Sequence, residues 1–267
     1  MTLGVIDVGT NTVHLLIVRC SPRQPWHIVH QEHHRTRLGD GGFVAGRLTR
    51  AAMTRTMTVL QRYAKTLRRF RVDRLEAAAT SAVRDAANGR LFVRRVRQRL
   101  GIPLRIMSGR REARLSYLGM LAMNRVRHPC MVVTIGGGSA QVIYGDRTSV
   151  RYATSVPLGC ARLAQQFLHH DPPSPAEIDR LTRHIRRIWT LVIQQLRHYR
   201  WRHAYGGSAA VADLAEVVAR MRGGVTPTRT SQRVIAQAEL QRTVTWLSTS
   251  TAAQRRRVAK LHAHREQ

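Results

Sequence analysis

The sequence predicts an α/β protein built from two related lobes with a cleft between them. An apolar strand, a glycine turn and a second apolar strand occur twice, at residues 3–18 and 131–144. Amphipathic helices follow each repeat, and 43% of the 267 residues are hydrophobic, as in globular proteins. At roughly 150 residues per domain, this length allows about two domains. We place them at residues 1–123 and 124–267.

The first half is predicted to alternate strands and helices. Apolar runs predict strands at residues 3–6, 15–18, 26–29, 75–79 and 104–107, with a glycine-rich loop at 37–46. Thr49 is expected to cap a helix, because apolar residues then recur at helical spacing at Met53, Met57, Leu60, Ala64 and Leu67. Further helices are predicted at residues 91–100 and from residue 108.

The second half repeats this pattern. Strands are predicted at residues 131–135, 141–144 and 151–156. Ser174, Pro175 and Glu177 form the signature of a capping box, which predicts the start of a long helix. Tyr205 leads into a glycine turn and another helix, and a last helical stretch is expected at about 232–260.

The charge is strongly positive. Lys and Arg number 45 against 15 Asp and Glu, for a net charge of +30, and every basic residue except Lys65 and Lys260 is arginine. The forked guanidinium suits phosphate oxygens, so a polyanionic partner is expected: nucleic acid, a nucleotide, polyphosphate or an acidic membrane. Compositional bias explains any single exposed arginine equally well. No nucleic-acid-binding motif is present and aromatic residues are 5%, so only nonspecific nucleic-acid binding through the arginines is expected.

The cysteines and the hydropathy indicate the compartment. Three scattered cysteines, Cys20, Cys130 and Cys160, argue against a disulfide framework and fit a reducing cytoplasm. No apolar run has the ~18 residues of a membrane span, and no signal peptide precedes the first strand. A cytoplasmic location without a membrane partner is therefore expected.

Three glycine turns follow apolar strands. Such turns leave backbone N–H groups available to phosphate oxygens, although many glycine turns serve only to reverse the chain. Three in one chain favour phosphate binding. They consist of Gly9, Thr10, Asn11 and Thr12; of Gly136, Gly137, Gly138 and Ser139; and of Gly206, Gly207 and Ser208.

Two acids stand near these turns. Asp7 ends the first strand and is either a turn cap or a ligand of a metal ion or of phosphate-bound water. Glu112 lies at a helix start among arginines, as either an ion-paired residue favoured by the helix dipole or a base that orients water.

Six segments resemble the Ppx/GppA family (exopolyphosphatase and guanosine pentaphosphate phosphatase) of the actin-like ATPase superfamily. In order they are DVGTNTVHLL, ATSAVRDAANG, SGRREARLSYLG, TIGGGSAQVIYGD, SVPLGCARL and YGGSAAVADLA. The resemblance runs from about residue 3 to about residue 260. It implies two ribonuclease-H-like lobes and hydrolysis of the terminal phosphoanhydride bond of inorganic polyphosphate, generally with Mg²⁺. Guanosine pentaphosphate is the alternative substrate.

The resemblance also implies roles for particular residues. Gly9–Thr12 and Gly136–Ser139 would be the two phosphate loops, and Gly206–Ser208 would occupy the place of the superfamily's adenosine motif. Arg84 would hold substrate phosphate, with an ion pair to Asp85 as the alternative. Glu112 would be the catalytic base, and Asp7 would bind the metal ion.

Three acids of the family pattern are replaced. Thr134 and Gln141 stand where the family usually has aspartate and glutamate, and Arg111 replaces a glutamate. Neutral oxygens hold Mg²⁺ less well than carboxylates do. These departures predict a weakened metal site, so a catalytically weakened protein that binds polyphosphate or guanosine pentaphosphate is the alternative to an enzyme.

The family pattern continues past the last residues of this sequence. A second lobe that is short at its C-terminal end is therefore expected. An uncovered sheet edge favours pairing, which predicts a homodimer.

Overall fold

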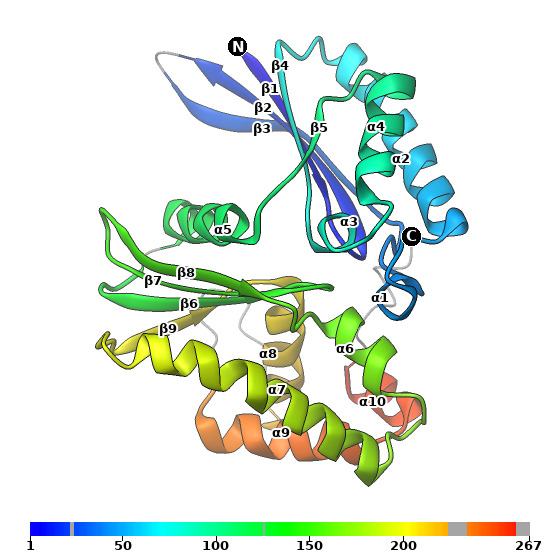
Figure 1. Cartoon of the computed structure of the whole chain (residues 1–267). Helices are drawn as coiled ribbons and strands as arrows, with labels where there is room; N and C mark the ends of the chain where they lie inside the picture. The colour runs from blue at the N-terminus through cyan, green and yellow to red at the C-terminus, as the bar shows by residue number, and fades with distance from the viewer. Residues whose placement is uncertain (22–23, 125, 224–233, 260–267) are drawn as a thin grey trace. The chain divides into compact units, whose positions relative to one another are not determined.

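The computed structural model describes residues 1–21, 24–124, 126–223 and 234–259. These residues form a mixed α/β fold with two sheets (Figure 1), which confirms the predicted class. The chain divides into two compact units. Unit 1 comprises Met1–Glu112, Gly136–Ser139 and Ser155–Gln166, and unit 2 comprises Ala113–Ile135, Ala140–Thr154 and Phe167–Gln267. The division at residue 123 stays a prediction.

Unit 1 contains a five-stranded sheet in the order β3-β2-β1-β4-β5. Strands β1 and β3 each pair antiparallel with β2, and β4 runs parallel to both β1 and β5. Residues alternate along β1, with Ile6 and Val8 fully buried and Val5 and Asp7 exposed. All five predicted strands are present, at Thr2–Val8 (β1), Thr12–Ser21 (β2), Gln24–Arg35 (β3), Arg74–Ala79 (β4) and Leu104–Ile106 (β5).

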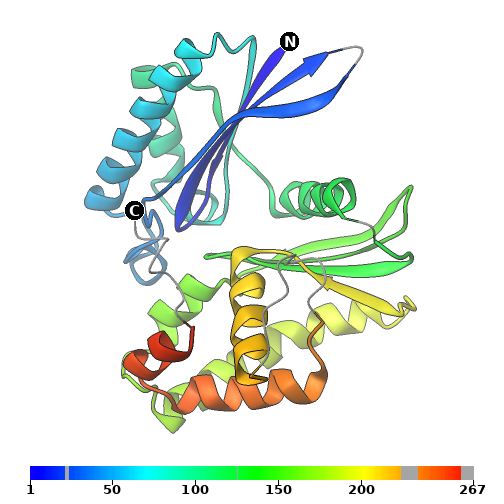
Figure 2. The same ribbon diagram turned by 180° about the vertical axis from the view of Figure 1, so that it is seen from behind.

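Helices α2 (Arg50–Arg69) and α4 (Gly89–Leu100) cover one face of this sheet (Figure 2). Thr49 caps α2 as predicted, since its side chain accepts a hydrogen bond from the Ala52 N–H at 3.3 Å. The fully buried Tyr63 of α2 donates its hydroxyl to the Val13 carbonyl at 2.9 Å, which ties helix to sheet. The unit also contains α3 (Ser81–Arg84) and the start of α5 (Gly109–Met123).

The glycine-rich segment 37–46, which was predicted as a loop, is not entirely a loop. It contains a single helical turn, α1 (Gly42–Ala45). Gly41 and Gly46 flank this turn with φ of +66° each, a left-handed conformation that glycine adopts without strain. The sequence pattern misses a helix of one turn because it carries no apolar period.

Unit 2 carries strands of a second sheet in the order β8-β7-β6-β9. Strand β6 is antiparallel to β7 and parallel to β9. This order repeats the β3-β2-β1-β4 order of the first sheet, so the internal repeat predicted from the glycine turns is confirmed as a repeat of topology. The strands are Cys130–Ile135 (β6), Ala140–Gly145 (β7), Val150–Val156 (β8) and His203–Gly206 (β9).

The helices of the second half begin with α6 (Cys160–Phe167), which was not predicted. The capping box is confirmed at the start of α7 (Pro175–Leu196), and α8 (Ala209–Met221) follows the third glycine turn. The prediction of a single last helix at about 232–260 was wrong. The described part forms α9 (Gln237–Thr249) and α10 (Ala252–Ala259), because Ser250 is extended and Asp171 accepts from the Ala252 N–H at 2.8 Å. Residues 232, 233 and 260 lie outside the described residues.

Two further expectations concern cysteines and the membrane. Cys20, Cys130 and Cys160 are all free. Among the helices that the structure describes, none combines the length and the hydropathy needed to cross a bilayer.

We predict that Glu177 makes stability depend on acid pH. Its side chain is 1% exposed and accepts hydrogen bonds from the N–H groups of Ser174 and His169, each at 2.8 Å, and from the His170 ring at 2.9 Å. These bonds, Ser174 first, lower the pKa of Glu177 from 4.5 to about 2. Since the folded pKa is the lower one, the stabilisation is complete above about pH 4.5 and is lost as the pH falls toward 2.

Thermal unfolding from pH 7 to pH 2.5 measures this effect. Glu177→Gln is expected to lower Tm at pH 7 and to flatten the decline of Tm in acid. Asp179→Asn, on the exposed face of the same helix, is the matched control. Equal pH profiles for the wild type and Glu177→Gln would contradict the assignment.

Candidate active site

The first two glycine turns touch one another in unit 1. A Cβ atom added at Gly137 would lie 3.0 Å from Thr10 Cβ, and one added at Gly138 would lie 2.6 Å from both Thr10 Oγ1 and Ser81 Oγ. Only glycine permits this approach. The two turns, the first following β1 and the second lying between β6 and β7, therefore form one surface together with the start of α3.

Backbone donors in these turns lack acceptors. Each turn is closed by one bond, Gly9 N–H to the Thr12 carbonyl at 3.0 Å and Gly136 N–H to the Ser139 carbonyl at 2.9 Å. Within the described residues, no acceptor lies in hydrogen-bonding position for the N–H groups of Thr10, Asn11, Gly137 and Gly138. Thr10 is 5% exposed and Gly138 is buried. Such donors need a partner, and phosphate oxygens supply one.

Arg162 of α6 holds the second turn in place. Its Nε donates to the Gly138 carbonyl at 2.7 Å, and its Nη2 donates to Ser81 Oγ at 3.1 Å. The guanidinium also pairs with Asp85 and lies 4.2 Å from the centre of the Phe43 ring. One planar cation thus joins the second glycine turn to α3 and the residue after it.

Arg84 and Glu112 form a half-buried ion pair. Arg84 Nη1 donates to Glu112 Oε2 at 2.8 Å and to the Met107 carbonyl at 3.1 Å. The side chains are 20% and 18% exposed. The predicted alternative, a pair between Arg84 and Asp85, is also present but longer, at 3.5 Å. The structure therefore brings the expected phosphate ligand and the expected base together.

Ionisation of Asp7 is disfavoured in the folded chain. Its side chain reaches solvent, but desolvation by the surrounding protein, and then the charge of Glu112, raises the pKa of Asp7 from 3.8 to about 6. A carboxylate whose charge is disfavoured by burial and by a second carboxylate is a place where a cation is favoured. Among the described residues, no group of three or more His, Cys, Asp and Glu could hold a metal ion. Magnesium commonly binds through one or two carboxylates plus substrate phosphates, so Asp7 fits an ion shared with substrate.

Two of the three residues that replace family acids face each other in unit 2. Thr134 and Gln141 are directly opposite partners of β6 and β7, and Thr134 Oγ1 donates to Gln141 Oε1 at 2.7 Å. Aspartate and glutamate in this register would repel unless a cation lay between them. The neutral pair satisfies itself without an ion.

The third glycine turn has hydrogen-bond partners within unit 2. Gly207 N–H donates to the Val133 carbonyl at 2.9 Å, and Ser208 caps α8 by accepting from the Val211 N–H at 3.2 Å. The phosphate-binding role of this turn stays a prediction.

Sequence reasoning missed Arg162. Arg162 lies in the segment SVPLGCARL, which resembles the family. One arginine among 43 has no distinguishing local signal, because its partners lie 24 to 81 residues away. The available sequence signal was Gly159, three residues before Arg162. Its backbone lies so close to the second glycine turn that an added Cβ atom would be 2.3 Å from the Gly138 carbonyl carbon.

A model of the Ppx/GppA phosphatase family matches residues 16–267. Exopolyphosphatase 2 of Mycobacterium tuberculosis is 35% identical over 193 residues, which are 69% of this chain and 60% of that protein. The chain thus spans less than two thirds of this relative's length. An exopolyphosphatase from Cytophaga hutchinsonii superposes with a TM-score of 0.85 at 26% identity, over 97% of this chain and 83% of that one. A family member from Aquifex aeolicus gives 0.72 at 24% identity with the same coverage, a likeness of fold.

We predict that Arg162→Lys destabilises unit 1. Lysine keeps the charge but loses the fork that reaches Gly138, Ser81 and Asp85 together, so buried acceptors lose their donor. We expect a loss of about 1–3 kcal/mol in the free energy of unfolding. Denaturant unfolding measures it, with the exposed Arg94→Lys on α4 as control. Equal stability of the two variants would show that Arg162 is not a tether.

We predict that Asp7→Asn stabilises the chain at pH 8 and not at pH 4. A raised folded pKa means that ionised Asp7 disfavours folding, and this penalty grows as the pH rises from 3.8 and is complete above about pH 6. Asparagine removes the charge and resembles the protonated acid. Denaturant unfolding at both pH values is the measurement, with the exposed Asp40→Asn as control. A gain of the same size at pH 4 would contradict the cause.

Proposed function

The chain belongs to the Ppx/GppA phosphatase family, and from this premise we propose that it hydrolyses the terminal phosphoanhydride bond of inorganic polyphosphate. The name of the relative from Mycobacterium tuberculosis, exopolyphosphatase 2, supports this choice of substrate. One observation in the structure carries the proposal. Acceptor-free N–H groups of two touching glycine turns lie next to α3, whose Arg84 is paired with Glu112.

The turns would bind phosphate oxygens through their backbone donors. Thr10, Asn11, Gly137 and Gly138 supply fixed dipoles that need no reorganisation when charge develops on phosphorus. Arg84 would shift its guanidinium from Glu112 to the terminal phosphate. Phosphoryl transfer needs positioning and charge neutralisation more than covalent chemistry, and this set of residues supplies both.

Release of Glu112 from Arg84 would leave the carboxylate ready for water. The oxygen of the water attacks the terminal phosphorus while the bridging P–O bond breaks, and Glu112 accepts the proton. The products are orthophosphate and a chain shortened by one unit. Glu112 thus has two states in this proposal, a partner of Arg84 before substrate arrives and a general base afterwards.

Asp7 would hold Mg²⁺ together with the substrate. The ion, when bound, supplies positive charge to the phosphate oxygens. The Asp7 carboxylate would bind it directly or through water.

Retention without turnover is the second candidate function. The hydrogen-bonded Thr134–Gln141 pair favours it, because this pair is stable without a metal ion. Arg111, in place of an acid, adds positive charge at the start of α5. In this case the chain binds polyphosphate or guanosine pentaphosphate and releases no phosphate.

We predict that Glu112→Gln lowers phosphate release about 100-fold or more, since general-base catalysis contributes on this scale. Orthophosphate release from long-chain polyphosphate, with and without Mg²⁺, is the assay. Guanosine pentaphosphate serves as the parallel substrate. Glu76→Gln, an exposed and ion-paired glutamate on β4, is the matched control.

Three outcomes separate the candidates. Release that Glu112→Gln abolishes supports the hydrolase, and faster release from guanosine pentaphosphate would reassign its substrate. Tight, salt-sensitive binding of polyphosphate without release supports the binder. Release that Glu112→Gln leaves unchanged would rule out the proposed base.

We predict that restoring the acid pair creates a Mg²⁺ site within unit 2. The double variant Thr134→Asp with Gln141→Glu places two carboxylates in direct register, so it should unfold at a lower temperature without Mg²⁺ and be rescued by millimolar Mg²⁺. The wild type should show a smaller Mg²⁺ effect. A Tm of the double variant that ignores Mg²⁺ would show that the restored pair binds no ion.

A further inference from the structure

The segment after α7 combines arginine with aromatic residues. Residues 197–202 are Arg-His-Tyr-Arg-Trp-Arg. The stretch 180–212 around it contains seven arginines and no Asp or Glu. None of these side chains belongs to the proposed hydrolytic site, so that site does not account for them. We call residues 197–202, together with Tyr144 of β7 and Tyr152 of β8, the arginine–aromatic surface.

Aromatic packing fixes this surface. The Tyr199 ring lies 4.7 Å from the Tyr144 ring and 6.3 Å from the Tyr152 ring, and Trp201 lies 6.4 Å from Tyr144 (centroid distances). Tyr144 is 8% exposed and forms the base of the cluster, whereas Trp201 is 37% exposed. The rings therefore form a platform with a buried base and an exposed edge.

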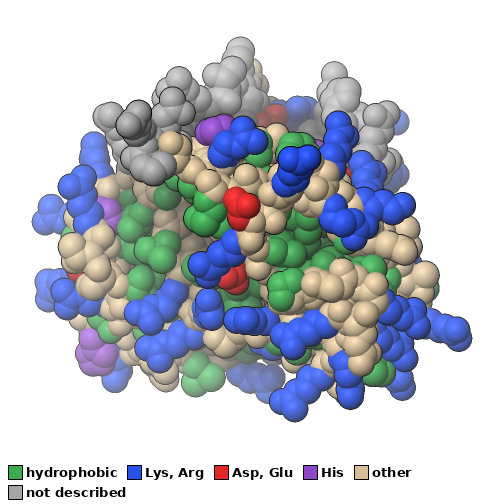
Figure 3. Space-filling view, turned by 90° about the horizontal axis from the view of Figure 1, so that it is seen from above, with side chains coloured by type: hydrophobic (Ala, Val, Ile, Leu, Met, Phe, Trp, Pro, Cys, Tyr) green, Lys and Arg blue, Asp and Glu red, His purple; other side chains and the backbone are tan. Residues whose placement is uncertain are grey.

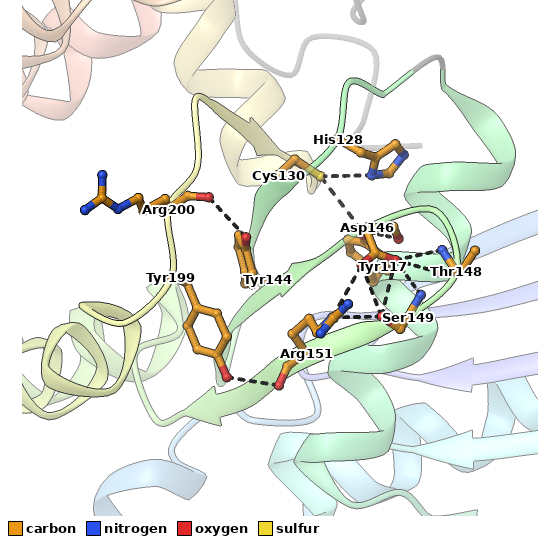
Figure 4. Close-up of polar contacts among 10 residues, drawn as sticks. All are labelled: Tyr117, His128, Cys130, Tyr144, Asp146, Thr148, Ser149, Arg151, Tyr199 and Arg200. Carbon is orange, nitrogen blue, oxygen red and sulfur yellow. Dashed lines mark hydrogen bonds and ion pairs between the residues drawn. The ribbon is translucent and has the colours of Figure 1, made fainter.

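Two hydrogen bonds connect this segment to strands β7 and β8. The Tyr144 hydroxyl donates to the Arg200 carbonyl at 3.0 Å, and the Tyr199 hydroxyl donates to the Arg151 carbonyl at 3.3 Å. Figure 4 shows both contacts, with the Arg200 side chain pointing away from Tyr144. The tyrosines thus anchor the main chain and leave the guanidinium group directed outward.

The arginines of the surface are available to a ligand. Arg197, Arg200 and Arg202 are exposed. None of their guanidinium groups has a carboxylate partner among the residues that the structure describes. The nearby acid Asp146 is occupied instead, because it accepts from Thr148, Ser149 and Arg151 (Figure 4). The surface is therefore positive and pre-organised.

We propose that the arginine–aromatic surface binds single-stranded nucleic acid. Proteins that hold single strands combine arginines along the phosphate backbone with aromatic rings on which bases stack. Inorganic polyphosphate uses the arginines but has no base to stack on Trp201. A duplex offers phosphates, but its base faces are covered. The rings therefore select an unpaired strand over the other two polyanions.

Binding of a labelled oligothymidylate of about 15 nucleotides to the full chain tests the proposal, since such surfaces cover a few to about 16 nucleotides. Trp201→Ala is expected to weaken binding about fivefold or more, while Trp201→Phe, which keeps a ring, stays near the wild type. Trp26→Ala, an exposed tryptophan of β3 in unit 1, is the matched control and should change nothing.

The salt dependence tests the arginines. Replacing Arg197, Arg200 and Arg202 together by alanine should reduce the slope of log K against log salt by about 2, because each phosphate contact to a single strand contributes about 0.7. The same triple change at the exposed Arg94, Arg95 and Arg99 of α4 is the control. Circular dichroism and Tm verify that every variant folds.

Three results would overturn the proposal. The first is equal binding by Trp201→Ala and Trp26→Ala. The second is a slope change in the α4 triple variant as large as that in the 197–202 triple variant. The third is a polyphosphate or duplex competitor whose affinity falls as much with Trp201→Ala as that of the oligonucleotide, since this would mean that no base stacks there.

Discussion

The guanidinium of Arg162 is the contact on which the geometry of unit 1 depends. It binds the carbonyl of Gly138, the hydroxyl of Ser81 and the carboxylate of Asp85 at once, and it rests on the Phe43 ring. Without such a cation, the second glycine turn would have no polar bond to α3. Backbone bonds from the N–H groups of Cys160 and Arg162 to the carbonyls of Gly136 and Gly137, each at 3.0 Å, hold the same turn to α6. A planar donor with several fixed N–H groups is required, because three acceptors in different directions must be satisfied together.

The arginines of this molecule differ in exposure and in partners from one region to another. Lys and Arg side chains are scattered over the face in Figure 3, with few acids among them. Most of these arginines are solvated and identify no partner. Near the turns, in contrast, Arg84 and Arg162 are 20% and 12% exposed and have defined acceptors. In unit 2, Arg197, Arg200 and Arg202 have no carboxylate partner among the residues that the structure describes. Position and pairing, rather than net charge, therefore separate solvated arginines, structural arginines and those proposed to bind a ligand.

Most elements of the fold could be predicted from the sequence, because their signals are local. The strand pattern of β1, the Thr49 cap and the Ser174 capping box all depend on residues within a few positions of one another. Prediction failed where the signal was short or came from elsewhere. The single turn of α1 has no apolar period, and the break between α9 and α10 depends on Asp171, which is 81 residues away from Ala252.

The sequence by itself determined the family and the two-fold repeat of strand and glycine turn, and it predicted the residues proposed to bind phosphate. It also showed that acids of the family pattern are replaced by Thr134, Gln141 and Arg111. Only the tertiary structure decided that Arg84 pairs with Glu112, that Thr134 bonds to Gln141, and that Arg162 joins Gly138 to Asp85. The physical reason is that a local pattern fixes φ, ψ and burial one segment at a time. Hydrogen bonds between distant side chains depend on how those segments pack.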